Sequence, residues 1–341
     1  MTMVTRAARY ILLGVGIAAM ICTASCKRGG PTPPVTGPGP RTDDGPEAAP
    51  VKWRIGFSQC TTTEPWRVLF NELLDREAAE HPEVELEILD AQDRTENQNA
   101  QMEALINKGV DAILISPKES AGLTAVVARA TSEGIPVIVL DRDVNTEDYA
   151  CFVGGNNLEI GREAGRYAVE VLGGEGKARG RIYEIWGGMG STPAQERHQG
   201  FREIVEQEPG ITLVGEQDGD WKQINGVNIM EAALKIEPDI DIVYAHNDPM
   251  AYGAYLAAER AGREADIKFI GIDANPDEGC KWVKEGKLAA TFVYPPPGEK
   301  GLQVALQILE GGEPEARRID LPTRRITNDT VDDYLREKGM L

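Results

Sequence analysis

Residues 135–142 read Ile-Pro-Val-Ile-Val-Leu-Asp-Arg, an apolar run around one proline that stops at an acid and a base. Unbroken runs of Val, Ile and Leu are typical of parallel strands that are covered on both faces. Open α/β sheets bind their ligands just beyond the carboxyl ends of such strands. The stretch therefore predicts a buried strand that delivers Asp141 and Arg142 to a ligand crevice. For an isolated dipeptide, a surface ion pair that merely ends the strand is the competing interpretation.

The same design recurs along the chain, and this repetition favours the crevice. Further apolar runs, several of which end in a group that can hydrogen-bond, span residues 111–117, 182–187, 241–248 and 268–273. Helical patterns lie between the strands, for example over residues 96–108 before Gly109 and over residues 121–132 before Gly134. This alternation predicts parallel sheets with right-handed crossovers.

After a loop, the pattern restarts with residues 151–155. The chain therefore predicts two doubly wound α/β lobes with parallel sheets. Segments 288–294 and 319–326 have proline and arginine flanks, and we interpret them as crossings between the lobes, which makes a three-crossing hinge. The expected division is 53–154 plus 295–320 for the N-terminal lobe and 155–294 plus 321–341 for the C-terminal lobe. A ligand would lie between the facing strand ends.

The first 25 residues have a different character. Two arginines precede an apolar run over residues 10–21, and small residues follow up to Cys26, which is the pattern of a secretory signal peptide. The sequence Thr-Ala-Ser-Cys ending at Cys26 resembles a bacterial lipoprotein cleavage box, which implies a lipidated Cys26; a plain signal peptide is the alternative. Residues 26–52 are proline-rich and predict an extended linker between a lipid anchor and a folded body.

Composition bounds the function. A chain of 341 residues with 41% hydrophobic and 27% charged residues can build one large or two medium domains. Its formal charge of −19 makes nucleic acid an unsuitable partner. Beyond the signal and the lipidation cysteine, Cys60, Cys151 and Cys280 form an odd set without Cys-x-x-Cys spacing, which disfavours a disulfide framework and a zinc site. We expect each to be a buried apolar residue, although one bridge stays open.

Short motifs follow one another in a fixed order from residue 53 to about residue 327. They are Ile-Gly-Phe-Ser-Gln at 55–59, Trp66-Arg67, Glu-Asn-Gln at 96–98, Gly-Val-Asp-Ala-Ile at 109–113, Leu-Asp-Arg at 140–142, Gln-Glu-Arg at 195–197, Tyr-Ala-His-Asn-Asp at 244–248 and Gly-Ile-Asp at 271–273. In this order and spacing they resemble periplasmic sugar-binding proteins of ABC importers, of the ribose- and galactofuranose-binding type. The resemblance implies the type I periplasmic binding protein fold.

Proteins of that family hold a sugar through hydrogen bonds from charged and amide side chains to its hydroxyls, while aromatic rings lie against its C–H faces. Carried over residue by residue, the resemblance implies a binding set of Glu64, Trp66, Arg67, Asp141, Arg142, Arg197, Trp221, Asn247, Asp273 and Tyr294. Glu64, Arg67 and Tyr294 depart from ribose binders, so the sugar, its ring form and its anomer stay open. For Trp66 and Trp221, core packing is the alternative to a cleft position.

Two other motifs have simpler explanations. Gly187-Gly-Met-Gly190 resembles a dinucleotide-binding turn but lacks the full Gly-x-Gly-x-x-Gly form and a suitably placed acid, so we favour a tight turn. His246 has no second histidine near it in the sequence, which disfavours catalysis. We expect no cofactor, no metal and no enzymatic activity, because a nucleophile–base set and a phosphate loop are missing from the pattern.

The leading hypothesis is an exported, membrane-tethered, monomeric receptor that closes around a monosaccharide and presents it to the permease of an ABC importer. It would be a lipoprotein of the periplasm or the cell surface. The alternative is a sugar-sensing lobe that signals to a receptor kinase or chemoreceptor, since both roles need only ligand-linked closure. A doubly wound enzyme and a repressor of the same fold are less favoured, the latter because of the signal segment.

Replacing Cys26 with serine tests the anchor. If Cys26 carries lipid, Cys26→Ser should move the protein from the membrane to the soluble fraction, because the anchor is the membrane attachment. Sugar affinity should be unchanged, since the linker lies outside the cleft. Fractionation followed by immunoblotting measures the partition, and a variant that stays with the membrane would contradict lipidation of Cys26.

Overall fold

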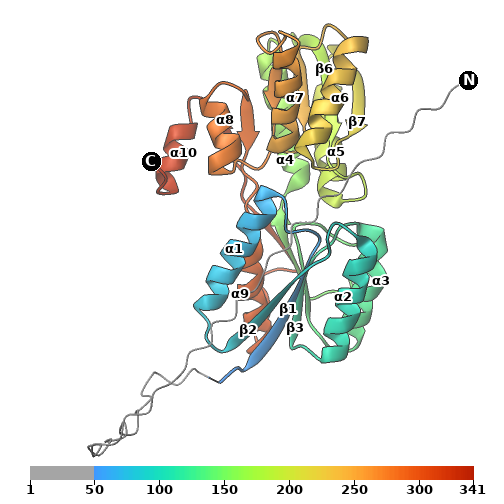
Figure 1. Ribbon diagram of the computed structural model, residues 1–341, viewed down its shortest axis with the longest axis vertical. Helices are drawn as coiled ribbons and strands as arrows, with labels where there is room; N and C mark the ends of the chain where they lie inside the picture. Colours follow the sequence, from blue (N-terminus) through green and yellow to red (C-terminus); the bar gives the residue numbers. More distant parts are fainter. Residues whose placement is uncertain (1–49) are drawn as a thin grey trace, which may run out of the picture. The chain divides into compact units, whose positions relative to one another are not determined.

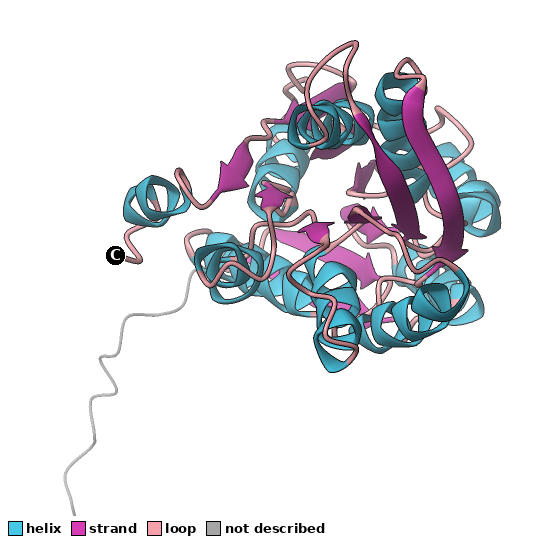
Figure 2. Ribbon diagram, turned by 90° about the horizontal axis from the view of Figure 1, so that it is seen from above, coloured by secondary structure: helices cyan, strands magenta, loops and turns pink. Residues whose placement is uncertain are grey.

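A computed structural model describes residues 50–341, which belong to one compact unit. The predicted signal peptide, Cys26 and most of the predicted linker lie outside the described residues. Within residues 50–341, no helix combines the length and apolarity needed to cross a membrane. The described chain folds into two six-stranded sheets with helices on both faces of each, as Figures 1 and 2 show.

The first sheet is parallel throughout and has the strand order β11-β5-β4-β3-β1-β2. Its strands are β1 (Trp53–Gln59), β2 (Val84–Asp90), β3 (Ala112–Ser116), β4 (Val137–Leu140), β5 (Cys151–Gly155) and β11 (Arg318–Leu321). The apolar run before Asp141 contains β4, an interior strand that is buried along its whole length. β5 pairs with β4 in this sheet, so the second copy of the pattern begins only after Gly155.

Four helices cover this sheet: α1 (Pro65–Ala79) and α9 (Gly298–Leu309) on one face, α2 (Thr95–Lys108) and α3 (Ser120–Ser132) on the other (Figure 1). Local chemistry sets their ends. Pro65 occupies the first turn of α1, where a missing N–H costs nothing. Gly109 ends α2 in the left-handed conformation with φ of 65°, as the sequence predicts for a glycine at that place.

The second sheet has the order β12-β10-β9-β8-β6-β7 and is parallel except for β12, which runs antiparallel to β10. Its strands are β6 (Arg179–Trp186), β7 (Gly210–Asp218), β8 (Ile242–Ala245), β9 (Lys268–Ile270), β10 (Ala290–Phe292) and β12 (Arg325–Thr327). Its helices are α4 (Asn157–Val171), α5 (Thr192–Val205), α6 (Gln223–Ile236), α7 (Asp248–Arg260), η1 (Pro276–Cys280), α8 (Lys281–Lys284) and α10 (Val331–Glu337).

The two faces of this second sheet carry separate cores because strand residues alternate in direction. Ile182 and Ile242 join the core that includes α4 and α5. Tyr183 and Val243, the next residue on each strand, join the core that includes α6 and α7.

The chain passes between the two sheets three times: between β5 and α4, between β10 and α9, and between β11 and β12. The last two passages fall in the segments with proline and arginine flanks. The predicted fold, two doubly wound lobes joined by a three-crossing hinge, is confirmed.

Helices α4 and α5 pack almost backbone to backbone, and glycines permit this approach. A Cβ at Gly200 would lie 2.1 Å from the carbonyl oxygen of Leu158, and a Cβ at Gly161 would lie 2.3 Å from that of Arg197. Such distances are below any real Cβ contact, so only glycine fits. Arg197 lies in the same stretch of α5, and the glycine contact therefore fixes the height at which its side chain stands.

Gly200→Ala should therefore destabilise the protein, because the new methyl group forces α5 away from α4. Overpacking of this kind costs about 1–3 kcal/mol. Chemical denaturation measures the loss. Gln199→Ala, which adds no atoms at the neighbouring exposed position, is the matched control and should stay near wild type. Equal stability of Gly200→Ala and the control would contradict the close helix contact.

Candidate functional site

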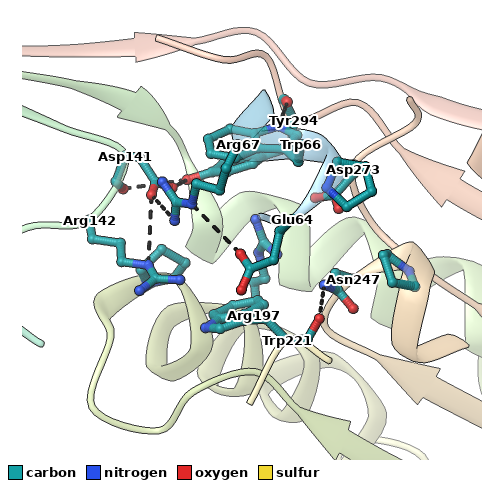
Figure 3. A pocket seen from close by; sticks show the side chains of 13 residues that line it. Glu64, Trp66, Arg67, Asp141, Arg142, Arg197, Trp221, Asn247, Asp273 and Tyr294 are labelled. Atoms are coloured by element: carbon teal, nitrogen blue, oxygen red, sulfur yellow. Dashed lines mark hydrogen bonds and ion pairs between the residues drawn. The ribbon is translucent and has the colours of Figure 1, made fainter. Parts of the chain in front are cut away.

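A cavity lies between the carboxyl ends of the two sheets, and all ten residues of the predicted binding set line it (Figure 3). Asp141 and Arg142 follow β4, Asn247 follows β8, and Asp273 follows β9. The remaining side chains come from helix starts, a loop and a crossing: Glu64, Trp66 and Arg67 at α1, Arg197 on α5, Trp221 before α6, and Tyr294 after β10. The structure thus brings the whole predicted set together.

Three further lining residues were missed by the sequence analysis: Pro65, Pro193 and Pro249. Each stands in the first turn of its helix, α1, α5 or α7. Proline has no N–H to leave unsatisfied at that position and its ring is apolar. The sequence signal was present, because helix starts directly after strand ends belong to the ligand edge of a doubly wound sheet.

Asp141 is the most heavily bonded acid of the site. Its carboxylate accepts hydrogen bonds from Ser116 Oγ at 3.0 Å and Tyr294 OH at 2.6 Å, and Arg67 Nη2 lies 2.7 Å away. Burial would raise the pKa of Asp141, but the charges of Arg67 and Arg142 and the hydroxyl of Tyr294 outweigh it and hold the pKa below its ordinary value. Asp141 is therefore ionised and already satisfied by the protein.

Arg197 is held in an equally buried position from the second lobe. Its Nε donates to Asn157 Oδ1 at 2.9 Å, and its Nη1 donates to the carbonyl oxygen of His246. The guanidinium lies over the ring of Tyr294, 4.4 Å from the centroid, and 5.5 Å from that of Trp221. These contacts fix the fork of Arg197 while its remaining nitrogen stays available for a ligand oxygen.

The imidazole of His246 supports this arrangement from outside the cavity. Its Nε2 lies 2.9 Å from Glu184, whose carboxylate also lies 3.1 Å from His198 Nδ1. Although no second histidine lies near His246 in the sequence, α5 brings His198 onto the same carboxylate in the fold. Among residues 50–341, Glu184, His198 and Glu216 have ligand atoms within 4.8 Å of one another and could hold a metal, away from the cavity.

Asp248 and Asp273 form a buried pair of acids at the second lobe's edge. Asp248 Oδ2 accepts from Ala274 N–H and Thr291 Oγ1, each at 2.9 Å, while its Oδ1 has no partner among the described residues. Burial raises the pKa of Asp248 to about 7. Burial and the neighbouring Asp248 raise the pKa of Asp273 as well. Asp248 was not among the predicted binding residues.

Two indoles form opposite walls of the cavity (Figure 3). Trp66 stacks on Tyr294 with centroids 5.1 Å apart and donates its Nε1–H to the Tyr294 carbonyl at 2.9 Å. Trp221 lies over Gly187, where a Cβ would be 2.2 Å from the ring. Both indoles also belong to hydrophobic cores. Both indoles therefore line the cleft and also pack in a core, so the two interpretations offered for them do not exclude each other.

The turn that begins at Gly187 is explained by this packing. Ser191 N–H donates to the carbonyl of Gly188 at 3.0 Å and closes a tight turn, as predicted. Gly187 has no side chain because the indole of Trp221 occupies that space. Three residues of the site have strained backbone conformations: Asp141, Trp221 and Asp273 have φ of 63°, 64° and 135°. Non-glycine residues adopt such values only where the surroundings enforce them.

The three cysteines beyond the signal region are free and buried, which confirms the expectation that each packs as a small apolar residue. Cys151 and Cys280 have raised thiol pKa values because burial disfavours the thiolate.

Comparison with known proteins gives consistent matches. A model described as a periplasmic binding protein domain matches residues 55–313. A ribose import binding protein of Bacillus subtilis (strain 168) is 33% identical over 262 residues, which cover 76% of this chain and 83% of that protein. The galactofuranose-binding protein of Escherichia coli (strain K12) is 34% identical over 238 residues, which cover 67% and 73%.

Solved structures give similar matches. The fructose binding periplasmic domain of a hybrid two component system is 38% identical with a TM-score of 0.81, and the match covers 84% of this chain and 95% of that one. A galactofuranose binding protein is 28% identical with a TM-score of 0.80, and the match covers 85% and 99%.

The pair of buried acids predicts a pH dependence of stability. A carboxyl whose pKa is raised in the folded state holds its proton more tightly there than in the unfolded chain, so its favourable contribution is full at low pH and is lost as pH rises through about 7. Between about pH 6 and pH 8, Asp248 alone should remove about 1 kcal/mol of unfolding free energy. Burial lowers the pKa of His246, and this has the opposite effect on stability: the free energy of unfolding falls as the pH drops below the ordinary pKa of histidine.

Asp248→Asn removes this titration and should flatten the profile across that window. Denaturation at a series of pH values gives the comparison. Asp277→Asn, at an exposed position four residues after Asp273, is the control and should keep the wild-type slope. An unchanged slope in Asp248→Asn would mean that Asp248 is ionised throughout.

Proposed function

The chain belongs to the periplasmic binding protein domain family, and on that premise we propose that it captures a monosaccharide between its two lobes and delivers it to the permease of an ABC importer. The observation that carries the proposal is the cavity. It combines charged and amide groups from both lobes with two facing indoles. The relatives named for ribose and galactofuranose binding support a sugar as the ligand.

The chemistry of the lining suits hydroxyl groups. A hydroxyl both donates and accepts a hydrogen bond, so it can join a carboxylate to a guanidinium. Glu64 and Asp273 offer acceptors, or a proton where their raised pKa values keep them neutral. Arg142 and Arg197 offer donors from opposite lobes. The apolar C–H face of a sugar ring would lie against Trp66 or Trp221, which leaves its hydroxyl edge to these polar groups.

Capture would follow from movement at the three crossings. We propose residues 53–154 with 295–320 as one moving body and residues 155–294 with 321–341 as the other. Closure removes water from the polar groups around the sugar, which strengthens each hydrogen bond. Any monosaccharide that gains more contacts in the closed form than in the open one shifts the equilibrium toward closure.

The ligand we propose is a pentose or a hexose, with the furanose form included. Relatives support both classes of sugar: the ribose import binding proteins are named for a pentose, and a solved galactofuranose binding protein is named for a hexose in its furanose form. The protein would act without chemical conversion of its ligand, as a monomer. It would be tethered outside the cytoplasmic membrane, in the periplasm or at the cell surface, through lipid on Cys26 and the linker of residues 26–52.

A sensory role is the second candidate, and one observation favours it. The fructose binding periplasmic domain that resembles this chain is part of a hybrid two component system. The same closed lobes can serve either partner. Sugar uptake separates the roles: deletion of the gene abolishes uptake of the bound sugar if the protein feeds an importer, and leaves uptake intact if it only signals.

Tryptophan substitutions in a sugar titration test the proposal. Ribose, arabinose, fructose and galactose are titrated against the protein while tryptophan fluorescence is followed, because closure on a sugar changes the surroundings of both pocket indoles. Trp221→Ala should weaken binding of the responding sugar by tenfold or more, about 1.4 kcal/mol per decade. The loss arises because the ring then has no indole surface.

Trp282 is the matched control. It is 8% exposed against 7% for Trp221, lies in the same lobe, and stacks on Tyr252 away from the cavity. Trp282→Ala should lower the melting temperature through the loss of about 3–5 kcal/mol of stability, while folded protein keeps its affinity. The proposed cleft is wrong if Trp221→Ala binds sugar as tightly as wild type.

A further inference from the structure

Four charged side chains bridge the two lobes beside Trp221. They are Asp93 after β2, Lys118 after β3, and Asp220 and Lys222 on either side of Trp221. We call this set the ion-pair ring. Lys118 Nζ lies 2.5 Å from Asp93 and 3.1 Å from Asp220, and Lys222 Nζ lies 2.9 Å from Asp93 and 2.5 Å from Asp220. Each charge therefore contacts two opposite charges.

Only two of the four contacts join the lobes. Asp93 and Lys118 follow strands of the first sheet, whereas Asp220 and Lys222 belong to the loop after β7 of the second. The pairs Lys118–Asp220 and Lys222–Asp93 cross the cleft, and the other two pairs lie within one lobe. Separation of the lobes would break both crossing pairs and keep the other two.

We infer that the ion-pair ring is a latch that positions Trp221 and stabilises the lobes when they are closed on the sugar. This inference rests on the proposed function. It assigns a role to four residues that do not line the cavity, and it links the closure of the lobes directly to one indole wall.

The backbone beside the ring explains why Trp221 needs such support. Asp220 and Trp221 have φ of 47° and 64°, a left-handed conformation that costs non-glycine residues free energy. Within the second lobe, the Asp220 N–H donates to Asp218 Oδ1 at 2.8 Å and Asn247 Nδ2 donates to the Trp221 carbonyl at 3.0 Å. In the closed form, the charges of Lys118 and Asp93 hold the loop from the opposite lobe.

The ring is shielded enough to have an effect and exposed enough to be screened by salt. The Lys118 side chain is 13% exposed and that of Lys222 is 43% exposed. The ring partners raise the pKa of Lys118 and lower that of Asp93, both against the effect of burial. A network that shares charges costs less side-chain entropy per contact than isolated pairs, which are worth little at a surface.

A neutral sugar should therefore show salt-dependent affinity. Added salt screens the ring in the closed form, whereas the sugar itself carries no charge that salt could screen. From about 0.02 M to about 0.5 M NaCl, we expect the wild-type Kd to rise roughly three- to tenfold. The sugar used is the one among ribose, arabinose, fructose and galactose that gives the largest fluorescence change.

Three variants isolate the latch. Lys222→Met removes one crossing pair, so it should weaken binding roughly threefold at low salt and reduce the salt dependence. Lys222→Arg keeps the charge and should restore both. Lys108→Met is the matched control: Lys108 pairs with Glu87 at 2.7 Å within one lobe and is 51% exposed, and its loss should change neither quantity.

A neutral contact across the same cleft gives a second comparison. Thr192 Oγ1 accepts a hydrogen bond from Asp143 N–H at 2.9 Å, which joins α5 to the loop after β4. Thr192→Val should weaken binding equally at every salt concentration, because no charge is lost. A purely structural effect of Lys222→Met would follow this pattern and would contradict the latch.

Failure of the latch can be told apart from failure of the proposed function. A wild type that binds sugar with the same Kd at low and high salt overturns the latch and leaves the sugar site intact. A wild type that binds none of the four sugars contradicts the proposed ligand. Scattering of the ligand-free protein then decides the latch: a smaller radius of gyration at low salt than at high salt, lost in Lys222→Met, supports it, and equal radii overturn it.

Discussion

The buried carboxylate of Asp141 is the point on which the rest of the site depends. An unpaired charge inside a protein costs several kcal/mol, so each of its donors must be in place when the chain folds. Those donors come from α1 through Arg67, from the end of β3 through Ser116, and from a crossing between the lobes through Tyr294. One acid thereby fixes a helix, a neighbouring strand end and part of the hinge relative to one another.

The second lobe has a different electrostatic character. Arg197 is satisfied by an amide and a carbonyl, and the acids beside it are pushed toward the neutral form by burial. Gly271 and Gly279 leave the space that the Asp248 carboxyl occupies, since a Cβ at either position would overlap it. Asp141 of the first lobe therefore supplies a fixed charge, whereas Asp248 and Asp273 of the second lobe can gain or lose a proton and so adapt to a hydroxyl that donates or accepts.

The strand pattern of the sequence was enough to predict the site residues that directly follow a strand. Asp141, Asn247 and Asp273 were predictable because an apolar run before a polar residue indicates a strand end, and parallel strands bring their ends to one edge. Trp66, Trp221 and Arg197 required the family resemblance, since they come from helices and a loop. Asp248 was missed because the burial that raises its pKa depends on Gly271 and Gly279, which the chain brings against its carboxyl only on folding. The histidine pair on Glu184 was missed for the same reason.

The proposed closure sets a limit on how strong any contact between the lobes can be. A sugar shifts the equilibrium only by its difference in affinity between the open and closed forms. Contacts strong enough to close the protein without sugar would uncouple closure from sugar binding. A partner that recognises the closed form would then no longer detect whether a sugar is bound. Partly exposed ion pairs, worth up to about 1 kcal/mol each, suit this limit better than a buried apolar interface, because they favour closure without enforcing it.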